Sequence, residues 1–470
     1  MSSVASTVWR VASLAYGLLA LCIFSFYALC DGSFFRWPSK TEKDDLALAR
    51  KQLWNLLDAP NGLEHHFFKL RSGFRLHYVS NRLSDSHNLV IFLHGFPDSW
   101  AIWRPLLSGS LRRKAKLIAV DLPGYGGSDG LPEYSATAML EAVTDFVVGM
   151  RDQYQPDSES YPSHGEEKVI LVGHDWGCLI GYRLAAEAPQ LATRFVLSNS
   201  FHIPLAASNA KRITAFAEQM LRRFIRQPLS SRNLPRRALT AFLPLLAQIK
   251  KSAYIFIFNL PRPLATFFGS MGNYWFLRLT HGLAAGSRHP LEGAVAAEIM
   301  ASSLGPSKSE AITTDLSGTS YPSSVLRRAA NGGWSEKIRL YREGLATGAW
   351  DKSLETLAEL ASIGESRRSS SGAGLLEDGP EGALKAKTTI VWGKRDPAID
   401  ARLAVEGIAD YLAMDSQVVM LPKTGHWVPF EQNGRDVLEE VIDWSIAPTK
   451  QDLMERVSKV YEGAKVTVQK

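Results

Sequence analysis

The feature that most constrains this chain is an aspartate, Asp175, in a strand, turn and helix pattern. The apolar run Val169–Val172 leads into Gly173, and Gly177 closes a small-X-Asp-X-small turn before the helix-like run Cys178–Ala186. This is the context of a nucleophile elbow, where a sharp turn exposes the central side chain above a strand end. Glycines flank it because bulky side chains cannot pack beside so tight a turn. The pattern predicts that Asp175 is a nucleophile.

An aspartate at this position predicts a different chemistry from a serine. A serine would form an acyl-enzyme from an ester or amide, whereas a carboxylate attacks an electrophilic sp³ carbon and becomes an alkyl ester. The carboxylate of Asp175 also needs no prior deprotonation to attack. The substrate is therefore expected to carry an epoxide or a carbon–halogen bond.

Short apolar runs without alternation predict buried strands of a parallel sheet. They are Leu89–Leu93, Leu117–Val120, Val169–Val172, Phe195–Ser198, Thr389–Trp392 and Val418–Leu421. Helical stretches such as 137–150 and 437–445 lie between them. The predicted class is α/β, with a mostly parallel central sheet flanked by helices.

The turn His94-Gly95-Phe96-Pro97 follows the strand 89–93, and Trp176 follows the aspartate. With these motifs the chain resembles the epoxide hydrolases of the α/β-hydrolase fold, from about Phe67 to Ile446. The resemblance implies a large, mainly helical cap inserted after the sixth core strand. The implied division is 1–40 membrane anchor and linker, 41–202 first part of the core, 203–384 cap or lid, 385–448 second part of the core, and 449–470 helical tail.

The resemblance also implies the partners of the nucleophile. Strand-like runs end in Asp396 and His426, which match the acid and base of the family in the chain order that this fold uses. His426 would activate water, and Asp396 would orient its imidazole. The backbone amides of Phe96 and Trp176 match the family's oxyanion hole, which would stabilise the ester carbonyl as water attacks it.

Two tyrosines of the inserted segment match the lid tyrosines of epoxide hydrolases, which protonate the ring oxygen. Tyr254 stands five residues before Asn259, where the family usually has glutamine, and Tyr341 precedes an arginine. Tyr274 and Tyr321 are the alternatives. The expected substrate-binding residues are His94, Pro97, Trp176, Asn259 and Trp427.

The predicted reaction is hydrolysis of lipophilic epoxides to vicinal diols through an ester at Asp175. Haloalkane dehalogenases share the Asp-Trp elbow but tend to carry asparagine after His-Gly, where this chain has Phe96. They remain the alternative among enzymes, and a catalytically idle ligand-binding protein is the alternative from another class. The cysteines Cys22, Cys30 and Cys178 form neither a disulfide framework nor a metal set, so no metal or cofactor is predicted.

The amino-terminal run Val11–Cys30 is an uncharged, mostly apolar stretch of 20 residues, enough to cross a bilayer as a helix. A cleaved signal peptide is the competing interpretation. Arg10 precedes the run, whereas Arg36, Lys40 and Lys43 follow it, which favours a cytosolic catalytic domain on a single-pass anchor. We expect a membrane of the endoplasmic reticulum type.

Basic charge is concentrated between Ile203 and Leu291. This stretch has 13 Lys and Arg and one acid, Glu218, in a chain of net charge +6. A basic amphipathic face of the cap would bind the anionic cytoplasmic leaflet of a membrane. Solvated arginines on cap helices are the alternative, and nucleic-acid binding is not predicted because no recognition module is present.

Overall fold

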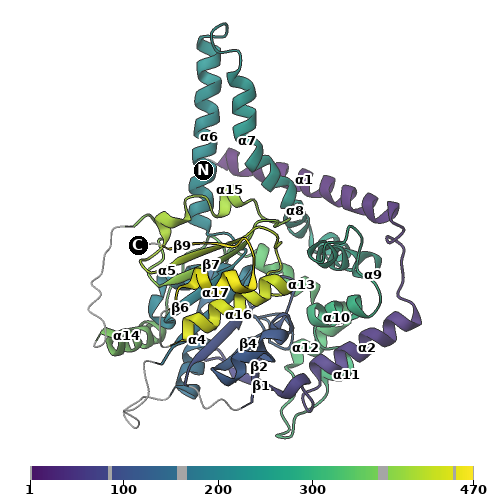
Figure 1. The fold of residues 1–470 in the computed structure, drawn as a ribbon. Helices are drawn as coiled ribbons and strands as arrows, with labels where there is room; N and C mark the ends of the chain where they lie inside the picture. Colours follow the sequence, from purple (N-terminus) through teal and green to yellow (C-terminus); the bar gives the residue numbers. More distant parts are fainter. Residues whose placement is uncertain (1–2, 83–86, 156–166, 369–378, 448–450, 469–470) are drawn as a thin grey trace.

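A central sheet organises the computed structural model, which describes residues 3–82, 87–155, 167–368, 379–447 and 451–468 (Figure 1). Within these residues the sheet has nine strands in the order β1-β2-β4-β3-β5-β6-β7-β8-β9. The strands are β1 Leu63–Lys69, β2 Arg75–Asn81, β3 Leu89–Leu93, β4 Lys116–Val120, β5 Val169–His174, β6 Arg194–Ser198, β7 Thr388–Gly393, β8 Gln417–Leu421 and β9 Lys465–Val468.

Strands β4, β3, β5, β6, β7 and β8 run parallel, whereas β1, β2 and β9 pair antiparallel at the two edges. The helices are α1 Ser3–Cys30, α2 Lys40–Trp54, α3 Arg104–Leu107, α4 Ala136–Tyr154, α5 Trp176–Glu187, α6 Ile203–Arg226, α7 Leu234–Lys251, α8 Ala253–Phe258, α9 Arg262–Ala284, α10 Gly293–Leu304, α11 Lys308–Ala311, α12 Ser323–Arg328, α13 Trp334–Lys337, α14 Leu354–Arg368, α15 Ala401–Ala404, α16 Gln432–Ile446 and α17 Leu453–Val460.

The central strands are apolar at every position because both faces of the sheet are covered. In β3, Ile91 and Leu93 pack in one hydrophobic core with α4 and α5. Val90 and Phe92 point to the opposite face, into a second core with α16 and α17. This alternation is the two-residue period of a strand. Because the central strands run parallel, their carboxyl ends lie at one edge of the sheet. The predicted α/β class and mostly parallel sheet are confirmed.

The chain between β6 and β7 is mainly helical and carries α6 to α14. Its first two helices, α6 and α7, form a hairpin that projects away from the rest of the molecule (Figure 1). The following helices, α8 and α9, lie closer to the sheet and contribute Phe258, Phe268 and Trp275 to one of the two cores. The amino-terminal helix α1 runs beside α8 and α9.

The carboxyl-terminal segment 449–470, predicted to be a helical tail, is helical only over α17, and residues 449–450 and 469–470 lie outside the described part. After α17 the chain forms β9, which pairs antiparallel with β8 and extends the sheet. Three of the four side chains of β9 are exposed, so its sequence carries little of the apolar pattern that identifies a strand. Tyr461 links this tail to the loop before His426, because its hydroxyl accepts a hydrogen bond from the Lys423 amide (2.7 Å).

We expect Tyr461→Phe to lower the free energy of unfolding by about 1–3 kcal/mol, because the Lys423 amide would lose its acceptor. Urea denaturation in detergent would measure the change. Tyr27→Phe is the matched control, since the Tyr27 side chain is 60% exposed, and it should change stability little. Equal effects of the two substitutions would contradict this role of the tail.

Candidate active site

Asp175 lies in a strained turn between β5 and α5. Its backbone has φ 51° and ψ −115°, a conformation that L-residues rarely adopt. The turn comes so close to neighbouring chain that a Cβ at Gly177 would lie 2.2 Å from the carbonyl oxygen of Leu93. A Cβ at Gly95 would lie 2.4 Å from Oδ1 of Asp175. Glycine is therefore required at both positions, and the elbow predicted from the sequence is the observed local structure.

The loops after β7 and β8 bring Asp396 and His426 to this elbow. Nδ1 of His426 donates to Oδ2 of Asp396 over 2.8 Å. Its Nε2 lies 3.6 Å from Oδ2 of Asp175. The side chains of His426 and Asp396 are almost fully buried, whereas that of Asp175 is 16% exposed. The three residues that the sequence predicts to act together are thus in one cluster, with the imidazole between the two carboxylates.

The charges in this cluster depend on one another. Burial alone would lower the pKa of His426, but the carboxylates of Asp396 and Asp175 outweigh burial and raise that pKa above its ordinary value. Burial would raise the pKa of Asp396, yet the charge of His426 and hydrogen bonds from His426 and Asn199 hold it below its usual range. The free site therefore favours the charged form of the imidazole.

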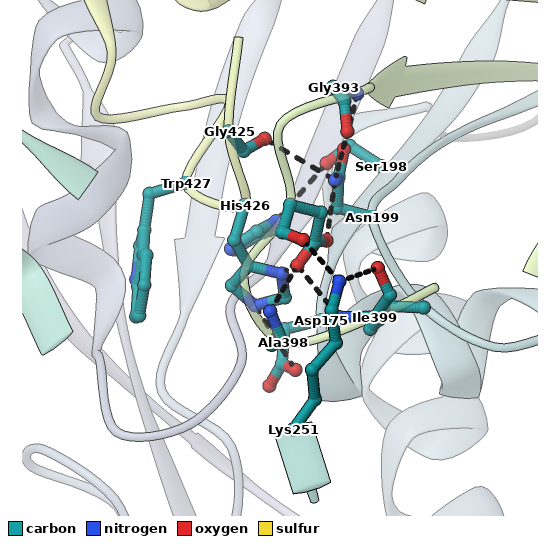
Figure 2. A network of polar contacts seen from close by, with 12 residues as sticks. Asp175, Ser198, Asn199, Lys251, Gly393, Ala398, Ile399, Gly425, His426 and Trp427 are labelled. Carbon is teal, nitrogen blue, oxygen red and sulfur yellow. Dashed lines mark hydrogen bonds and ion pairs between the residues drawn. The ribbon is translucent and has the colours of Figure 1, made fainter. Parts of the chain in front are cut away.

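Asn199 is a member of the cluster that the sequence analysis did not identify. It follows β6 with φ 43°, a conformation that asparagine tolerates better than most residues. Its Nδ2 donates to Oδ2 of Asp396 over 2.7 Å, and its Oδ1 accepts from the Gly393 amide over 2.9 Å. The side chain thus ties the end of β6 to the end of β7 and orients the acid (Figure 2).

Lys251 is the second residue that the sequence analysis missed. It ends α7, and its ammonium donates to the backbone carbonyls of Asp396 over 2.7 Å and of Ile399 over 2.9 Å. Figure 2 shows the side chain reaching from the helix to the loop that carries the acid. Lys251 therefore connects the helical segment to the loop that follows β7. Its side chain also lines the pocket described next.

A pocket of about 150 Å³ opens above Asp175. Its wall is mostly apolar and comes from the sheet, from the helical segment and from α1. The lining residues are Phe24, Phe96, Pro97, Asp175, Lys251, Tyr254, Phe276, Leu279, Thr280, Leu283, Tyr341, Pro397, Ala398, His426 and Trp427.

The two predicted lid tyrosines face this pocket together. Tyr254 belongs to α8, and Tyr341 ends a short 3₁₀ helix, Ile338–Tyr341, with ring centroids 6.1 Å apart. Burial, and then nearby acidic groups including Asp175, raise the pKa of Tyr254. Burial, followed by Tyr254 and Asp175, raises the pKa of Tyr341. Both phenols therefore stay protonated at neutral pH and can donate hydrogen bonds to a ligand above Asp175.

Phe96 and Trp176, whose backbone amides are the predicted oxyanion donors, make different kinds of contact near Asp175. The Phe96 amide donates to Oδ1 of Asp175 over 2.8 Å. The ring of Trp176 packs edge-on against Tyr341, with the two ring centroids 4.8 Å apart. Oδ1 of Asp175 is thus held by a backbone donor, while Oδ2 faces His426.

Several predicted binding residues lie outside the pocket wall. His94 is fully buried, where Nδ1 bonds the Gly95 carbonyl and Nε2 accepts from the Leu122 amide, so it supports the turn rather than a substrate. Asn259 is exposed at the end of α8, and its amide donates to the Ile255 carbonyl. Trp176 is buried but does not line the pocket.

The alternative tyrosines do not line the pocket. Tyr321 donates to the Trp54 carbonyl, and Tyr274 packs beside α10. Pro97 and Trp427 line the pocket. The indole of Trp427 donates to Oδ2 of Asp98 over 3.0 Å and packs edge-on against His426. Asp98 was not identified from the sequence, and it fixes the orientation of this wall.

The fold and the cluster define a class of protein: an α/β-hydrolase core with an aspartate at the nucleophile elbow and a histidine–aspartate pair facing it. A model of the alpha/beta hydrolase family matches residues 90–440. The chain belongs to this family.

Curated relatives with similar sequences carry the name epoxide hydrolase. The chain is 34% identical to Epoxide hydrolase 3 of Mus musculus over 147 residues, which are 29% of this chain and 36% of that protein. It is 29% identical to Epoxide hydrolase 4 of Mus musculus over 191 residues, 40% of this chain and 49% of that protein. The matches thus span between about a third and a half of these relatives.

Solved structures of epoxide hydrolases also resemble this chain. The Cif epoxide hydrolase from Acinetobacter nosocomialis aligns with a TM-score of 0.47 at 17% identity, covering 87% of this chain and 97% of that one. The Bacillus megaterium epoxide hydrolase in complex with an inhibitor aligns with a TM-score of 0.46 at 19% identity, covering 81% and 99%.

We expect Lys251→Met to slow turnover about tenfold, because the loop carrying Asp396 would lose two hydrogen bonds from a charged donor. Rapid-mixing kinetics would measure separately the two steps predicted from the sequence, alkylation of Asp175 and hydrolysis of the resulting ester. In that predicted reaction only hydrolysis should slow, since Asp396 would act through His426. Lys250→Met is the matched control, because Lys250 precedes Lys251 in the sequence and its side chain is exposed. An equal loss in both steps would indicate general damage instead of positioning.

Proposed function

We propose that the protein is an epoxide hydrolase that converts lipophilic epoxides to vicinal diols. The observation that carries the proposal is the placement of one reactive carboxylate, Asp175, in a pocket that also contains two phenols and the imidazole of His426. Serine-type acyl transfer does not use phenols opposite the nucleophile, whereas opening an epoxide requires a proton donor for its oxygen.

In the first step, Oδ2 of Asp175 attacks a ring carbon of the epoxide, and the carbon–oxygen bond of the ring breaks. The departing alkoxide takes a proton from Tyr254 or Tyr341, so the product is a hydroxyalkyl ester of Asp175. A tyrosinate remains beside it. The carboxylate oxygen is already ionised, and the phenols lower the cost of the negative charge that develops on the ring oxygen.

Ester formation changes the charge beside His426. The negative charge of Asp175 is lost, so one of the two interactions that raise the pKa of His426 disappears. The imidazolium can then release its proton, which balances the proton regained by the tyrosinate. The neutral imidazole is the form that accepts a proton from water, so alkylation itself prepares the base for the second step.

In the second step, water loses a proton to Nε2 of His426 as its oxygen adds to the ester carbonyl. The tetrahedral oxyanion forms on Oδ1, toward which the Phe96 amide already points. Collapse breaks the bond between the carbonyl carbon and the diol oxygen, which takes the proton from His426. The remaining carboxyl proton of Asp175 then passes to His426, which restores the starting charges. Asp396, held by Asn199 and Lys251, keeps the imidazole oriented throughout, and the mechanism uses no cofactor.

We further propose that the helical segment 203–384 is a cap over a core formed by 41–202 and 385–448. This division is supported by the position of α6 to α14 between β6 and β7 and by the tyrosines that this segment contributes to the pocket. The cap would exclude water from the alkylation step and admit the reacting end of the substrate.

We propose that α1 attaches the chain to a membrane as a single-pass anchor, with the catalytic domain on the cytosolic side of an endoplasmic reticulum-type membrane. Thr7–Cys30 is an apolar helical stretch with a mean hydropathy of 1.9 and is mostly exposed. A signal sequence has a similar length and composition. The basic residues that follow the helix support the proposed orientation.

The hairpin of α6 and α7 supports a second membrane contact. Its outer half exposes apolar side chains, of which Ile225 is 76% and Leu229 78% exposed. Basic residues accompany them: Arg222, Arg223, Arg226, Arg232, Arg236 and Arg237. Glu218 pairs with Arg222, which leaves a strong positive excess. We propose that this tip rests on anionic lipid, where both kinds of side chain gain contact.

Intact-mass measurement of the His426→Gln variant tests the reaction. Without the base, the ester at Asp175 should accumulate after incubation with an epoxide, because alkylation precedes the step that needs activated water. The adduct should carry the mass of the whole epoxide, and the wild-type chain should form the diol. The double variant with Asp175→Asn is the control and should remain unmodified.

An adduct formed from a haloalkane without its halogen, and none from an epoxide, would instead assign the chain to dehalogenation. The absence of any adduct from either class of compound would favour a ligand-binding role.

Charge reversal at the hairpin tip tests the membrane contact. Replacing Arg223 and Arg226 by Glu should weaken the binding to phosphatidylserine vesicles by tenfold or more, because each basic residue near an anionic surface contributes about 1 kcal/mol. The matched control replaces Arg112 and Arg113 of the core, which are also exposed. Flotation with vesicles of the protein lacking residues 1–40 would measure the difference, because the proposed anchor would otherwise bind both kinds of vesicle. Equal binding to neutral and anionic vesicles would contradict an electrostatic contact.

A further inference from the structure

One face of α1 is built into the cap instead of standing free of it. The ring of Tyr16 packs edge-on against Phe256 of α8, with centroids 4.8 Å apart. At Gly17 the two helices approach so closely that a Cβ would lie 2.7 Å from the carbonyl oxygen of Phe256. Ala20 and Ala28 continue the same face and are 3% and 0% exposed. Small residues thus allow the helix to lie directly on α8 and α9.

The carboxyl-terminal end of α1 is fixed by polar contacts. The carboxylate of Asp31 accepts a hydrogen bond from Nε1 of Trp275 over 2.6 Å. Arg36, just beyond, forms ion pairs with Glu42 of α2 and with Glu292 before α10. These contacts fix the position of α1 along the cap.

Phe24, at the centre of the packed face, reaches the pocket. Its ring lies edge-on to Phe268, Trp275 and Phe276 of α9, at centroid distances of 5.4, 6.3 and 6.0 Å. It is also part of the wall that encloses Asp175. The amino-terminal helix therefore supplies a side chain to the site where the proposed reaction takes place.

The opposite face of α1 is apolar and exposed. Its exposed side chains include Leu14, Leu18, Leu19, Ile23, Phe26 and Tyr27. On the neighbouring helix α9, Leu283 lines the pocket and is nevertheless 44% exposed, so the pocket reaches the outside of the molecule beside it. Because the second half of α1 is held by the cap, the proposed insertion of α1 would bring this part of the cap into contact with the lipid.

The size of the pocket limits what it can enclose. A cavity of about 150 Å³ holds little more than one benzene ring. The rest of a larger lipophilic substrate must extend past the wall, and the apolar side chains available there are Phe24, Leu279 and Leu283.

We infer that α1 is a wall of the substrate site, and that a long aliphatic epoxide enters from the lipid beside Leu283 of α9 with its chain against Phe24. The inference rests on the proposed function for the identity of the reacting group. It assigns Phe24 as a residue that determines chain-length preference, because its ring contacts the alkyl chain and not the reacting atoms.

Kinetics on a homologous series of terminal epoxyalkanes test the inference, with the full-length chain in detergent micelles. Phe24→Ala should lower kcat/KM for the long members about tenfold and leave the shortest member nearly unchanged, because only long chains lose apolar contact. Phe26→Ala is the matched control, since Phe26 lies on the same helix with a side chain 63% exposed, and it should preserve the wild-type dependence on chain length. Phe24→Leu should restore most of the preference for long chains.

Two results would overturn the inference: an equal loss of activity for every chain length in Phe24→Ala, or chain-length profiles that are the same in Phe24→Ala and Phe26→Ala. If the wild-type chain turns over no epoxide, the proposed function fails, and the binding of long-chain 1,2-diols still tests the wall. Quenching of tryptophan fluorescence would report that binding, because Trp427 lines the pocket. Weaker diol binding in Phe24→Ala than in Phe26→Ala would support the inference, and equal binding would reject it.

Discussion

The site depends on one imidazole held between two carboxylates. His426 is hydrogen-bonded to Asp396 over 2.8 Å and lies 3.6 Å from Asp175. Each of the two carboxylates favours the charged form of the imidazole. In the proposed mechanism the same arrangement would serve two opposite requirements, because a charged imidazole would stabilise the carboxylate of Asp175 and a neutral one would activate water. The loss of one negative charge on ester formation is what separates these two states, so the order of the proposed steps follows from electrostatics. Asn199 and Lys251 matter because they hold the remaining carboxylate in place.

The sequence predicted the fold class and the reactive cluster because their signals are local. Asp175, Asp396 and His426 each follow a short apolar strand, and the fold brings strand ends together at one edge of the sheet. Asn199 and Lys251 carry no such local signal. Their contacts with Asp396 join residues 197 and 145 positions apart, so only the folded chain reveals them.

The positions of two predicted binding residues, away from the pocket wall, have a similar physical origin. His94 and Asn259 were assigned from their positions in family motifs, yet each satisfies its polar atoms with nearby backbone and does not line the pocket. The tail strand β9 was missed because an edge strand with exposed side chains lacks an apolar period. The apolar composition of α1 predicts an affinity for lipid, but composition does not reveal which face of a helix packs on its own protein.

The hairpin and the catalytic acid are joined by a single helix. α7 starts near the projecting tip and ends at Lys251, whose ammonium holds the loop of Asp396. A helix of this length is a rod of about 27 Å, interrupted by a proline at Pro244, where a backbone hydrogen bond is lost and bending is easiest. A displacement of the tip would therefore bend α7 at Pro244 before it moved Lys251. The proline would thus mechanically separate the outer half of the hairpin from the loop of Asp396.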